Sequence, residues 1–297
     1  MDGVLTSRLE FDAIGTSWEI DTPAPVVPDL KESILDLVER FDGIYSRFRG
    51  DSIVTRIARA ADGGTFNFPA DAVSMFELYD RLHSATDGAV DPLVGRDLEM
   101  MGYDGDYSLV PDKEAMSCLA KQRPDWRRDV MRDDSSVTVR TPLVIDLGAI
   151  GKGTLVDRIA GLLSAHSLDA FVVDGSGDMH HRGDVAIDVG LEHPLDPGMM
   201  IGIAKLQNGS ICASASNRRR WGDGLHHVLD GRTGRPTTDV IATWAVAADT
   251  ATADGLATAL FFGLPSRLMT TFDFSFVRMF ADGRVEVSDN FHGEVFT

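Results

Sequence analysis

Basic residues are scarce in this chain of 297 residues, which has 28 Lys and Arg against 46 Asp and Glu. The resulting net charge of −18 disfavours a nucleic-acid partner, because phosphate backbones bind to basic surfaces. Cysteine is scarcer still: Cys118 and Cys212 are too few for a disulfide framework or a structural zinc site. No apolar run approaches the roughly 20 residues that cross a bilayer, so we expect no membrane span.

The first ten residues, MDGVLTSRLE, also lack the basic start and apolar stretch of a secretory signal. We therefore expect a cytoplasmic protein. Apolar residues make up 43% of the chain and charged residues 25%, which is ordinary for a globular protein and argues against disorder. Together with the chain length, these proportions predict one compact domain over residues 1–297.

Apolar residues recur at helical spacing in four segments. These begin at Asp29, where Asp29 and Glu32 resemble a capping box, after Pro69, after the glycine-rich stretch 148–153, and at Thr252. Other apolar runs predict strands at 9–20, 143–145, 170–173, 185–189, 201–206, 240–248, 274–280 and 284–287. Because helices and strands do not alternate strictly, we predict an α+β fold with a mixed sheet rather than a doubly wound one.

The stretch 145–153 reads IDLGAIGKG: a predicted strand ending in Asp146, a glycine-rich turn, and a helix with Lys152 in its first turn. Such a turn presents backbone N–H groups to an anion, and the lysine adds a positive charge. It is not a Walker A loop, since no Ser or Thr follows the lysine. An ordinary strand-to-helix turn with a surface lysine would look the same.

The stretch 174–178, DGSGD, follows another predicted strand. A Rossmann fingerprint would require glycine at position 180, where His180 stands. A dinucleotide fold is therefore disfavoured. Asp174 and Asp178 flank the turn, and this arrangement suits either a ligand contact or turn formation alone.

A third segment, 225–236, brings an imidazole, a carboxylate, a guanidinium and a hydroxyl together in His227, Asp230, Arg232 and Thr233. Adjacent histidines on a strand point to opposite faces, so at most one of the pair 226–227 faces a given site. The spacing does not match zinc motifs such as HExxH. A proton-carrying histidine beside Asp230 is the favoured interpretation.

Asp254 and Thr258 are four residues apart on a predicted helix and so share one face. Carboxylate and hydroxyl oxygens are hard ligands that suit Mg²⁺. An aspartate near a helix start is also explained by the helix dipole. The run Arg218–Arg220 is a local basic cluster that would attract phosphates if it lay beside the glycine-rich turn.

Taken together, these segments resemble the FAD:protein FMN transferases, the ApbE-type flavin transferases. The resemblance covers about residues 9–263, with 264–297 forming a C-terminal hairpin that completes the fold. The motifs that carry it are Asp146–Gly153, His227–Gly234, Ala253–Thr258, Ser46–Ser52 and Asp87–Pro92. It implies an enzyme that uses Mg²⁺, attaches FMN from FAD through a phosphoester bond to a Ser or Thr of an acceptor flavoprotein, and releases AMP.

The resemblance also implies the residues of the site. His227 and Asp230 would be catalytic, and Mg²⁺ would be held by Asp254, Thr258 and the backbones of Ala149 and Ala257. The flavin nucleotide would contact Ile14, Phe48, Ala89, Val90, Asp91, Asp146, Lys152, Ser214 and Thr233. Ile14 would lie near the isoalloxazine.

The chain departs from the family pattern at Ile53, Ala58, Ala213, Ala215 and Gly231. Phe48 stands where tyrosine is common, which removes a hydroxyl but keeps a face for stacking. The metal positions and Lys152 are intact, which favours binding of FAD with Mg²⁺. The departures leave two other functions open: a Mg²⁺-dependent FAD pyrophosphatase giving FMN and AMP, and a flavin-binding protein without turnover.

Overall fold

The computed structural model describes residues 4–119, 123–217, 219–222 and 224–296. Arg218 and the Cys118 side chain lie outside what it describes. Counted over these residues, the main sheet has eight strands, and neighbouring strands run antiparallel. In spatial order they are β1 (Ser7–Ala13), β2 (Thr16–Thr22), β6 (Phe171–Asp174), β7 (Asp178–Arg182), β10 (Gly209–Ala215), β15 (Val240–Ala247), β16 (Ser275–Phe280) and β17 (Val285–Val287).

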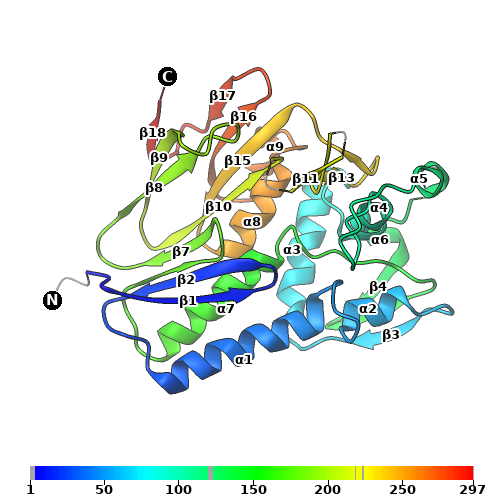
Figure 1. Ribbon diagram of the computed structural model, residues 1–297, viewed down its shortest axis with the longest axis horizontal. Helices are drawn as coiled ribbons and strands as arrows, with labels where there is room; N and C mark the ends of the chain where they lie inside the picture. Colours follow the sequence, from blue (N-terminus) through cyan, green and yellow to red (C-terminus); the bar gives the residue numbers. More distant parts are fainter. Residues whose placement is uncertain (1–3, 120–122, 218, 223, 297) are drawn as a thin grey trace.

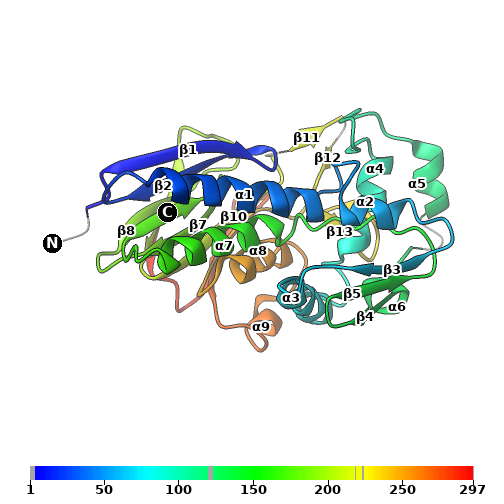
Figure 2. The ribbon, with the colours of Figure 1, turned by 90° about the horizontal axis from the view of Figure 1, so that it is seen from below.

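Helices cover one face of this sheet, which confirms the α+β prediction (Figures 1 and 2). The expected mixed sheet is antiparallel throughout the described strands, because neighbouring strands are joined without parallel crossovers. The covering helices are α1 (Pro28–Tyr45), α7 (Gly151–Ala165) and α8 (Thr250–Ala259), and α3 (Ala72–Ala85) packs against α8. The shorter helices are α2 (Ile53–Ala58), α4 (Gly95–Met100), α5 (Lys113–Leu119), α6 (Trp126–Asp129), α9 (Pro265–Leu268) and a 3₁₀ turn over Pro92–Val94. Within the described ranges, no helix combines the length and apolar character that crossing a membrane requires.

A smaller sheet packs on the opposite face of the main sheet. It is formed by β8 (Ile187–Glu192), β9 (Met200–Leu206) and β18 (Gly293–Val295). Successive side chains of β10 and β15 point to opposite faces of the main sheet. Cys212 and Ala245 pack in the core under the helices, whereas Ile211 and Trp244 pack in the core under the smaller sheet. The molecule is therefore layered as helices, main sheet and small sheet.

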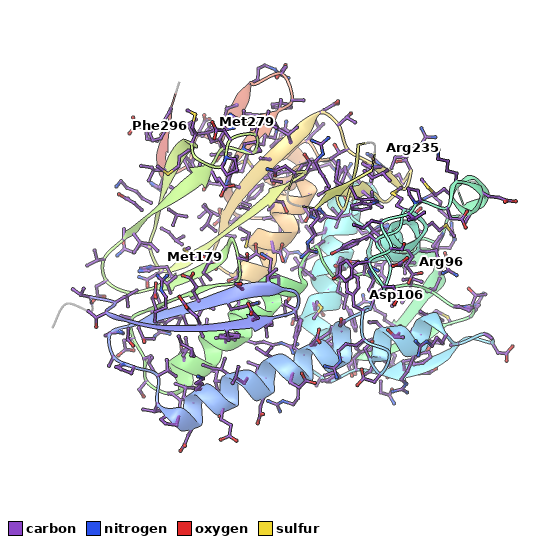
Figure 3. The ribbon with its side chains drawn as sticks, viewed as in Figure 1. Arg96, Asp106, Met179, Arg235, Met279 and Phe296 are labelled. Atoms are coloured by element: carbon purple, nitrogen blue, oxygen red, sulfur yellow. The ribbon has the colours of Figure 1, made fainter. Side chains whose placement is uncertain are left out.

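The remaining strands form small sheets near α3 and α4. One has β3 (Gly64–Asn67), β5 (Ser136–Val139) and β4 (Val130–Asp133). Two ribbons are β11 (Arg220–Trp221) with β12 (Leu225–His226), and β13 (Leu229–Asp230) with β14 (Arg235–Pro236). Figure 3 places Arg96 and Asp106 at this end of the molecule, away from Met279 and Phe296.

Three sequence-based predictions of local structure were wrong. The expected single strand over 9–20 is a hairpin, because Ile14 and Gly15 both have positive φ (44° and 76°) and reverse the chain in two residues. The expected capping box is absent, since α1 begins at Pro28 and Asp29 already lies in its first turn. The segment 143–145 is buried but is not a strand, and the next N–H, of Asp146, donates to the Pro92 carbonyl at 2.7 Å.

Candidate active site

A cavity of about 730 Å³ lies where the main sheet, α7, α8 and the α4 end of the molecule meet. Most of the predicted site residues line it: Ile14, Phe48, Ala89, Val90, Asp91, Asp146, Ala149, Lys152, Ser214, His227, Asp254 and Thr258. They come from turns, strands and helices across most of the sequence. Ile14 reaches the cavity from the strained two-residue turn between β1 and β2, and such strain is often found at functional sites.

One end of the cavity, here called the carboxylate end, consists of Lys152, Asp178, Asp254 and Thr258. Lys152 Nζ lies 2.8 Å from Asp178 Oδ2, and Asp178 is 1% exposed. Burial, reinforced by the negative charge of Asp178, raises the pKa of Asp254 well above its ordinary value. Burial alone would lower the pKa of Lys152, but the two carboxylates outweigh it and raise that pKa. Lys152 thus supplies the positive charge beside two buried carboxyl groups, those of Asp178 and Asp254.

The carboxylate end fits a hard divalent cation. Asp178 Oδ2 is shut off from water and lies against the Lys152 ammonium at 2.8 Å. Because this one positive charge lies beside two buried carboxyl groups, a further cation would offset the remaining negative charge. The Thr258 hydroxyl and the Asp254 carboxylate add the oxygen ligands that Mg²⁺ prefers.

Contacts between α7 and α8 hold this end in place. Gly153, in the first turn of α7, donates its N–H to Asp254 Oδ2 at 3.0 Å. A Cβ at position 153 would lie 2.3 Å from the Thr250 carbonyl oxygen, so α7 and α8 approach this closely only because the residue is glycine. Asp157 accepts the N–H groups of Thr250 and Ala251, both at 2.8 Å, and so joins the start of α8 to α7.

Asp146 is held by two donors. Its Oδ1 accepts the Gly148 N–H at 2.7 Å, and its Oδ2 accepts Arg47 Nε at 2.5 Å. Burial would raise the pKa of Asp146, but the Arg47 guanidinium outweighs it and holds that pKa below its ordinary value. Both terminal nitrogens of Arg47 are shut off from water and have no hydrogen-bond partner within the described part of the chain.

His227 lines the cavity as a neutral imidazole. Burial, with the positive charge of Arg219, lowers its pKa to about 3. Its Nδ1 is buried and finds no partner among the residues described. A neutral imidazole is the form that can accept a proton.

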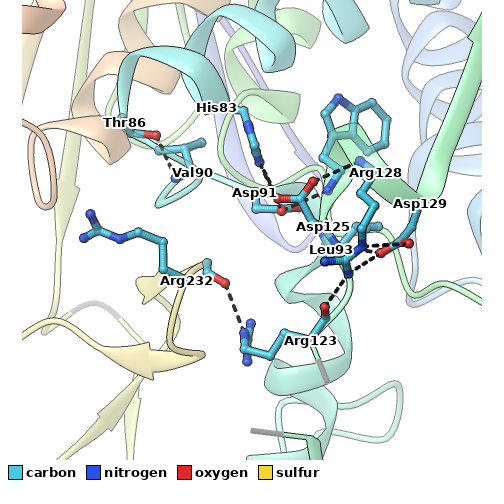
Figure 4. A network of polar contacts seen from close by, with 12 residues as sticks. His83, Thr86, Val90, Asp91, Leu93, Arg123, Asp125, Arg128, Asp129 and Arg232 are labelled. Carbon is cyan, nitrogen blue, oxygen red and sulfur yellow. Dashed lines mark hydrogen bonds and ion pairs between the residues drawn. The ribbon is translucent and has the colours of Figure 1, made fainter. Parts of the chain in front are cut away.

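The Asp91 carboxylate is hydrogen-bonded to other groups of the protein, as Figure 4 shows. Its carboxylate accepts the N–H groups of Leu93 (2.8 Å) and Trp126 (3.1 Å), and His83 Nε2 lies 3.5 Å from it. Asp125 lies 3.3 Å from the same imidazole nitrogen. The hydrogen bond to Asp91 raises the pKa of His83 against the effect of burial. Asp91 therefore shapes this wall of the cavity.

Gly231, one of the departures from the family pattern, packs against the same wall. Its N–H donates to the Ala89 carbonyl at 2.8 Å, and a Cβ there would lie 2.5 Å from the Gly88 oxygen. Arg123 Nε donates to the Gly231 carbonyl at 3.1 Å (Figure 4). Proline at this position would lose the bond to Ala89 and collide with the loop.

Three predicted site residues lie outside the lining of the cavity. The Asp230 carboxylate is paired with Arg232, with Nη2 to Oδ2 at 2.6 Å. The Thr233 hydroxyl accepts the Arg235 N–H within the same turn. The Ala257 carbonyl accepts the Thr243 hydroxyl at 2.6 Å, so this oxygen already has a partner.

Sequence reasoning did not assign several polar and aromatic residues that line the cavity, among them Arg47, Tyr103, Tyr107, Asp178 and Arg219. The position of Asp178, one of two carboxylates that flank a glycine-rich turn, was a partial indication of a ligand contact. Arg47 stood in a supporting motif, and Arg219 in the basic run. Tyr103 and Tyr107 carried no signal, because no periodicity or motif surrounds them.

The comparisons with known proteins agree with this geometry. The ApbE family model matches residues 14–273. The chain belongs to the ApbE family. It is 30% identical over 286 residues to the FAD:protein FMN transferase of Treponema pallidum (strain Nichols), covering 86% of this chain and 78% of that protein. It is 24% identical to the FAD:protein FMN transferase of Escherichia coli (strain K12), covering 82% and 74%.

Solved structures of the family have the same fold. The crystal structure of the ApbE protein from Thermotoga maritima superposes with a TM-score of 0.82 at 27% identity, covering 95% of this chain and 97% of that one. The flavin transferase ApbE from Vibrio cholerae, at 22% identity, has the same TM-score and covers 97% and 98%. Membership of the ApbE family and the α+β fold are therefore confirmed.

Proposed function

We propose that this chain is an FAD:protein FMN transferase, which takes FAD as substrate, attaches FMN to a Ser or Thr of an acceptor protein and releases AMP. The observation that carries the proposal is the carboxylate end, where two buried carboxyl groups, Asp178 and Asp254, lie beside a single lysine. Membership of the ApbE family supports the same reaction.

Mg²⁺ would be held by Asp254, Thr258 and the backbone oxygen of Ala149, with Asp178 beside them. A bound Mg²⁺ would supply positive charge against the pyrophosphate of FAD. Lys152 and the N-terminus of α7 would attract phosphate oxygens, since Lys152 lines the cavity and a helix N-terminus carries partial positive charge. These local charges offset the net charge of −18, which by itself repels a nucleotide.

The acceptor hydroxyl must lose a proton as its oxygen attacks the FMN phosphorus. His227 is the proposed proton acceptor because of its position: it lines the cavity, and its Nδ1 has no partner among the described residues. Its pKa, which burial lowers, makes it a weak base before substrate binds. Asp230, whose carboxylate is paired with Arg232, would act on the neighbouring turn rather than on substrate. The cytoplasmic location expected from the N-terminus stays a prediction.

The test is mass spectrometry of the protein incubated with FAD, Mg²⁺ and a candidate acceptor that carries an acidic Ser/Thr-Gly-Ala motif. We expect an FMN adduct on the acceptor and one AMP for each adduct. AMP and free FMN without an adduct would assign FAD pyrophosphatase activity instead. FAD that binds and stays intact for hours with Mg²⁺ present would assign a binding protein without turnover.

A further inference from the structure

The end of the cavity at α4, here called the aromatic end, consists of Arg47, Phe48, Tyr103 and Tyr107. The Arg47 guanidinium carbon lies 4.1 Å from the centroid of the Phe48 ring. The Tyr107 ring stacks on the same ring with centroids 5.1 Å apart and planes 10° from parallel. Phe48, the residue expected to stack on the flavin, is therefore already in contact with a guanidinium and with a stacked ring.

Tyr107 is the ring at this end that remains open to a ligand. One of its faces rests on Phe48, and Tyr103 meets it at an interplanar angle of 83°. Tyr107 lines the cavity and is nevertheless 50% exposed. An aromatic ring with one face supported and half its surface exposed is a platform for a planar ligand.

The loop around Tyr107 is built to hold that ring in place. Tyr107 and Leu109 have positive φ (51° and 53°), which is costly for residues with side chains. Asp104 offsets this cost: its Oδ1 accepts the N–H groups of Asp106 and Ser108, both at 3.0 Å, and its Oδ2 accepts the Ser108 hydroxyl at 2.6 Å. The ring is thus presented by a preformed loop.

The product of the proposed reaction indicates which ring of FAD would stack here. FMN becomes covalently tethered to the acceptor, so its isoalloxazine has to leave through the mouth of the cavity together with the acceptor. AMP leaves freely, and its adenine can occupy the interior. A half-exposed platform at the rim suits the ring that must withdraw while tethered.

We propose that Tyr107 is the residue that stacks on the isoalloxazine of FAD, with Phe48 supporting it from behind and Asp104 fixing its loop. This inference rests on the proposed function, because it takes FAD to be the ligand. It moves the stacking contact from Phe48, where the resemblance places it, to a loop in which the sequence shows no motif.

Flavin fluorescence tests the proposal directly. A tyrosine in stacking contact quenches flavin emission by electron transfer, whereas phenylalanine does not. We expect Tyr107→Phe to bind FAD within about twofold of the unaltered protein, since stacking is kept, while the emission of bound FAD rises severalfold. The matched control is Tyr103→Phe, which loses its 2.7 Å bond from Arg219 but should leave the emission low. Unchanged emission in Tyr107→Phe, or a rise in Tyr103→Phe alone, would overturn the proposal.

Affinity supplies a second, independent readout. Tyr107→Ala should weaken FAD binding about tenfold and leave the affinity for ADP, which lacks the isoalloxazine, unchanged. Asp104→Ala should weaken FAD binding severalfold, with no further loss when combined with Tyr107→Ala, because both act through one ring. Equal losses for FAD and ADP would place the adenine at Tyr107 and overturn the assignment. If the unaltered protein bound no FAD, the proposed function would fail instead, so the two failures are distinguishable.

Discussion

The two ends of the cavity are held by different means. At the carboxylate end, Lys152, Asp178 and Asp254 stand on α7, β7 and α8, and backbone contacts between the two helices fix their spacing. At the aromatic end, Phe48 and Tyr107 stand on loops that are held by ring stacking and by side-chain hydrogen bonds. The end that neutralises charge is rigid, whereas the end that receives a ring depends on a few local contacts.

This difference has a physical reason. Charge stabilisation in phosphoryl transfer depends on fixed positions, because displacing a cation or a carboxylate weakens the electrostatic interaction directly. A stacked ring tolerates lateral displacement, and it has to be released after each reaction. Substitutions at the two ends and in their supporting contacts test this difference, and those that should have the strongest effect come first.

Asp254→Ala removes a carboxylate from the rigid end. We expect Mg²⁺-dependent AMP release to fall about 100-fold or more, since a metal supplies several kcal/mol of charge stabilisation. The measurement is the rate of AMP release as a function of Mg²⁺ concentration. The control, Asp157→Asn, alters a carboxylate that caps α8, so it should lower the Tm but keep the Mg²⁺ dependence. Full activity in Asp254→Ala would refute the metal assignment.

Arg47→Met leaves Asp146 without its cation. Breaking such a buried pair should lower the free energy of unfolding by about 3 kcal/mol at pH 7, measured by urea titration. Because the folded pKa of Asp146 is lowered, this stability is present above the unfolded carboxyl pKa and disappears as pH falls through the folded pKa.

The control for Arg47→Met is Arg49→Met. Arg49 pairs with carboxylates of Glu39 and Asp51 that are about 70% exposed, so its loss should lower the free energy of unfolding far less than the loss of Arg47. Equal losses of unfolding free energy in the two variants would mean that burial does not strengthen the contribution of the Arg47–Asp146 pair.

Gly153→Ala tests the helix contact behind the carboxylate end. The added Cβ would meet the Thr250 backbone and Asp254, so we expect a loss of about 1–3 kcal/mol together with reduced activity. Gly161→Ala is the control on the same helix: nothing lies within 4 Å of its Cβ position, and it should stabilise by about 0.4–1 kcal/mol. If Gly153→Ala left stability and activity unchanged, α7 and α8 could move apart without loss of unfolding free energy.

His83→Gln probes the wall around Asp91 (Figure 4). Its neighbours raise the pKa of His83, so the stabilisation is complete below the unfolded pKa and disappears as pH rises through the folded pKa. The Tm difference from the unaltered protein should therefore be larger at pH 5.5 than at pH 8.5. A difference that is independent of pH would exclude a role for the imidazolium.

Much of the site could be predicted from the sequence because the motifs are local. Asp254 and Thr258 follow from helical periodicity, and Lys152 follows from a turn that leads into a helix. The contact between Asp178 and Lys152 could not be predicted, since it joins β7 to α7 across the sheet. The hairpin at Ile14 was missed because a β-branched residue rarely adopts positive φ.

The amino-acid sequence by itself determined the α+β class and the acidic balance, because composition and periodicity are local properties. Short motifs indicated the family, and the resemblance to it pointed to twelve of the residues that line the cavity. Only the tertiary structure decided how those residues are arranged. It left Asp230, Thr233 and Ala257 outside the lining, packed Arg47 and Tyr107 against Phe48, and brought Tyr107 to the rim. Such contacts join segments that are distant in sequence, and packing in three dimensions determines which faces stay open.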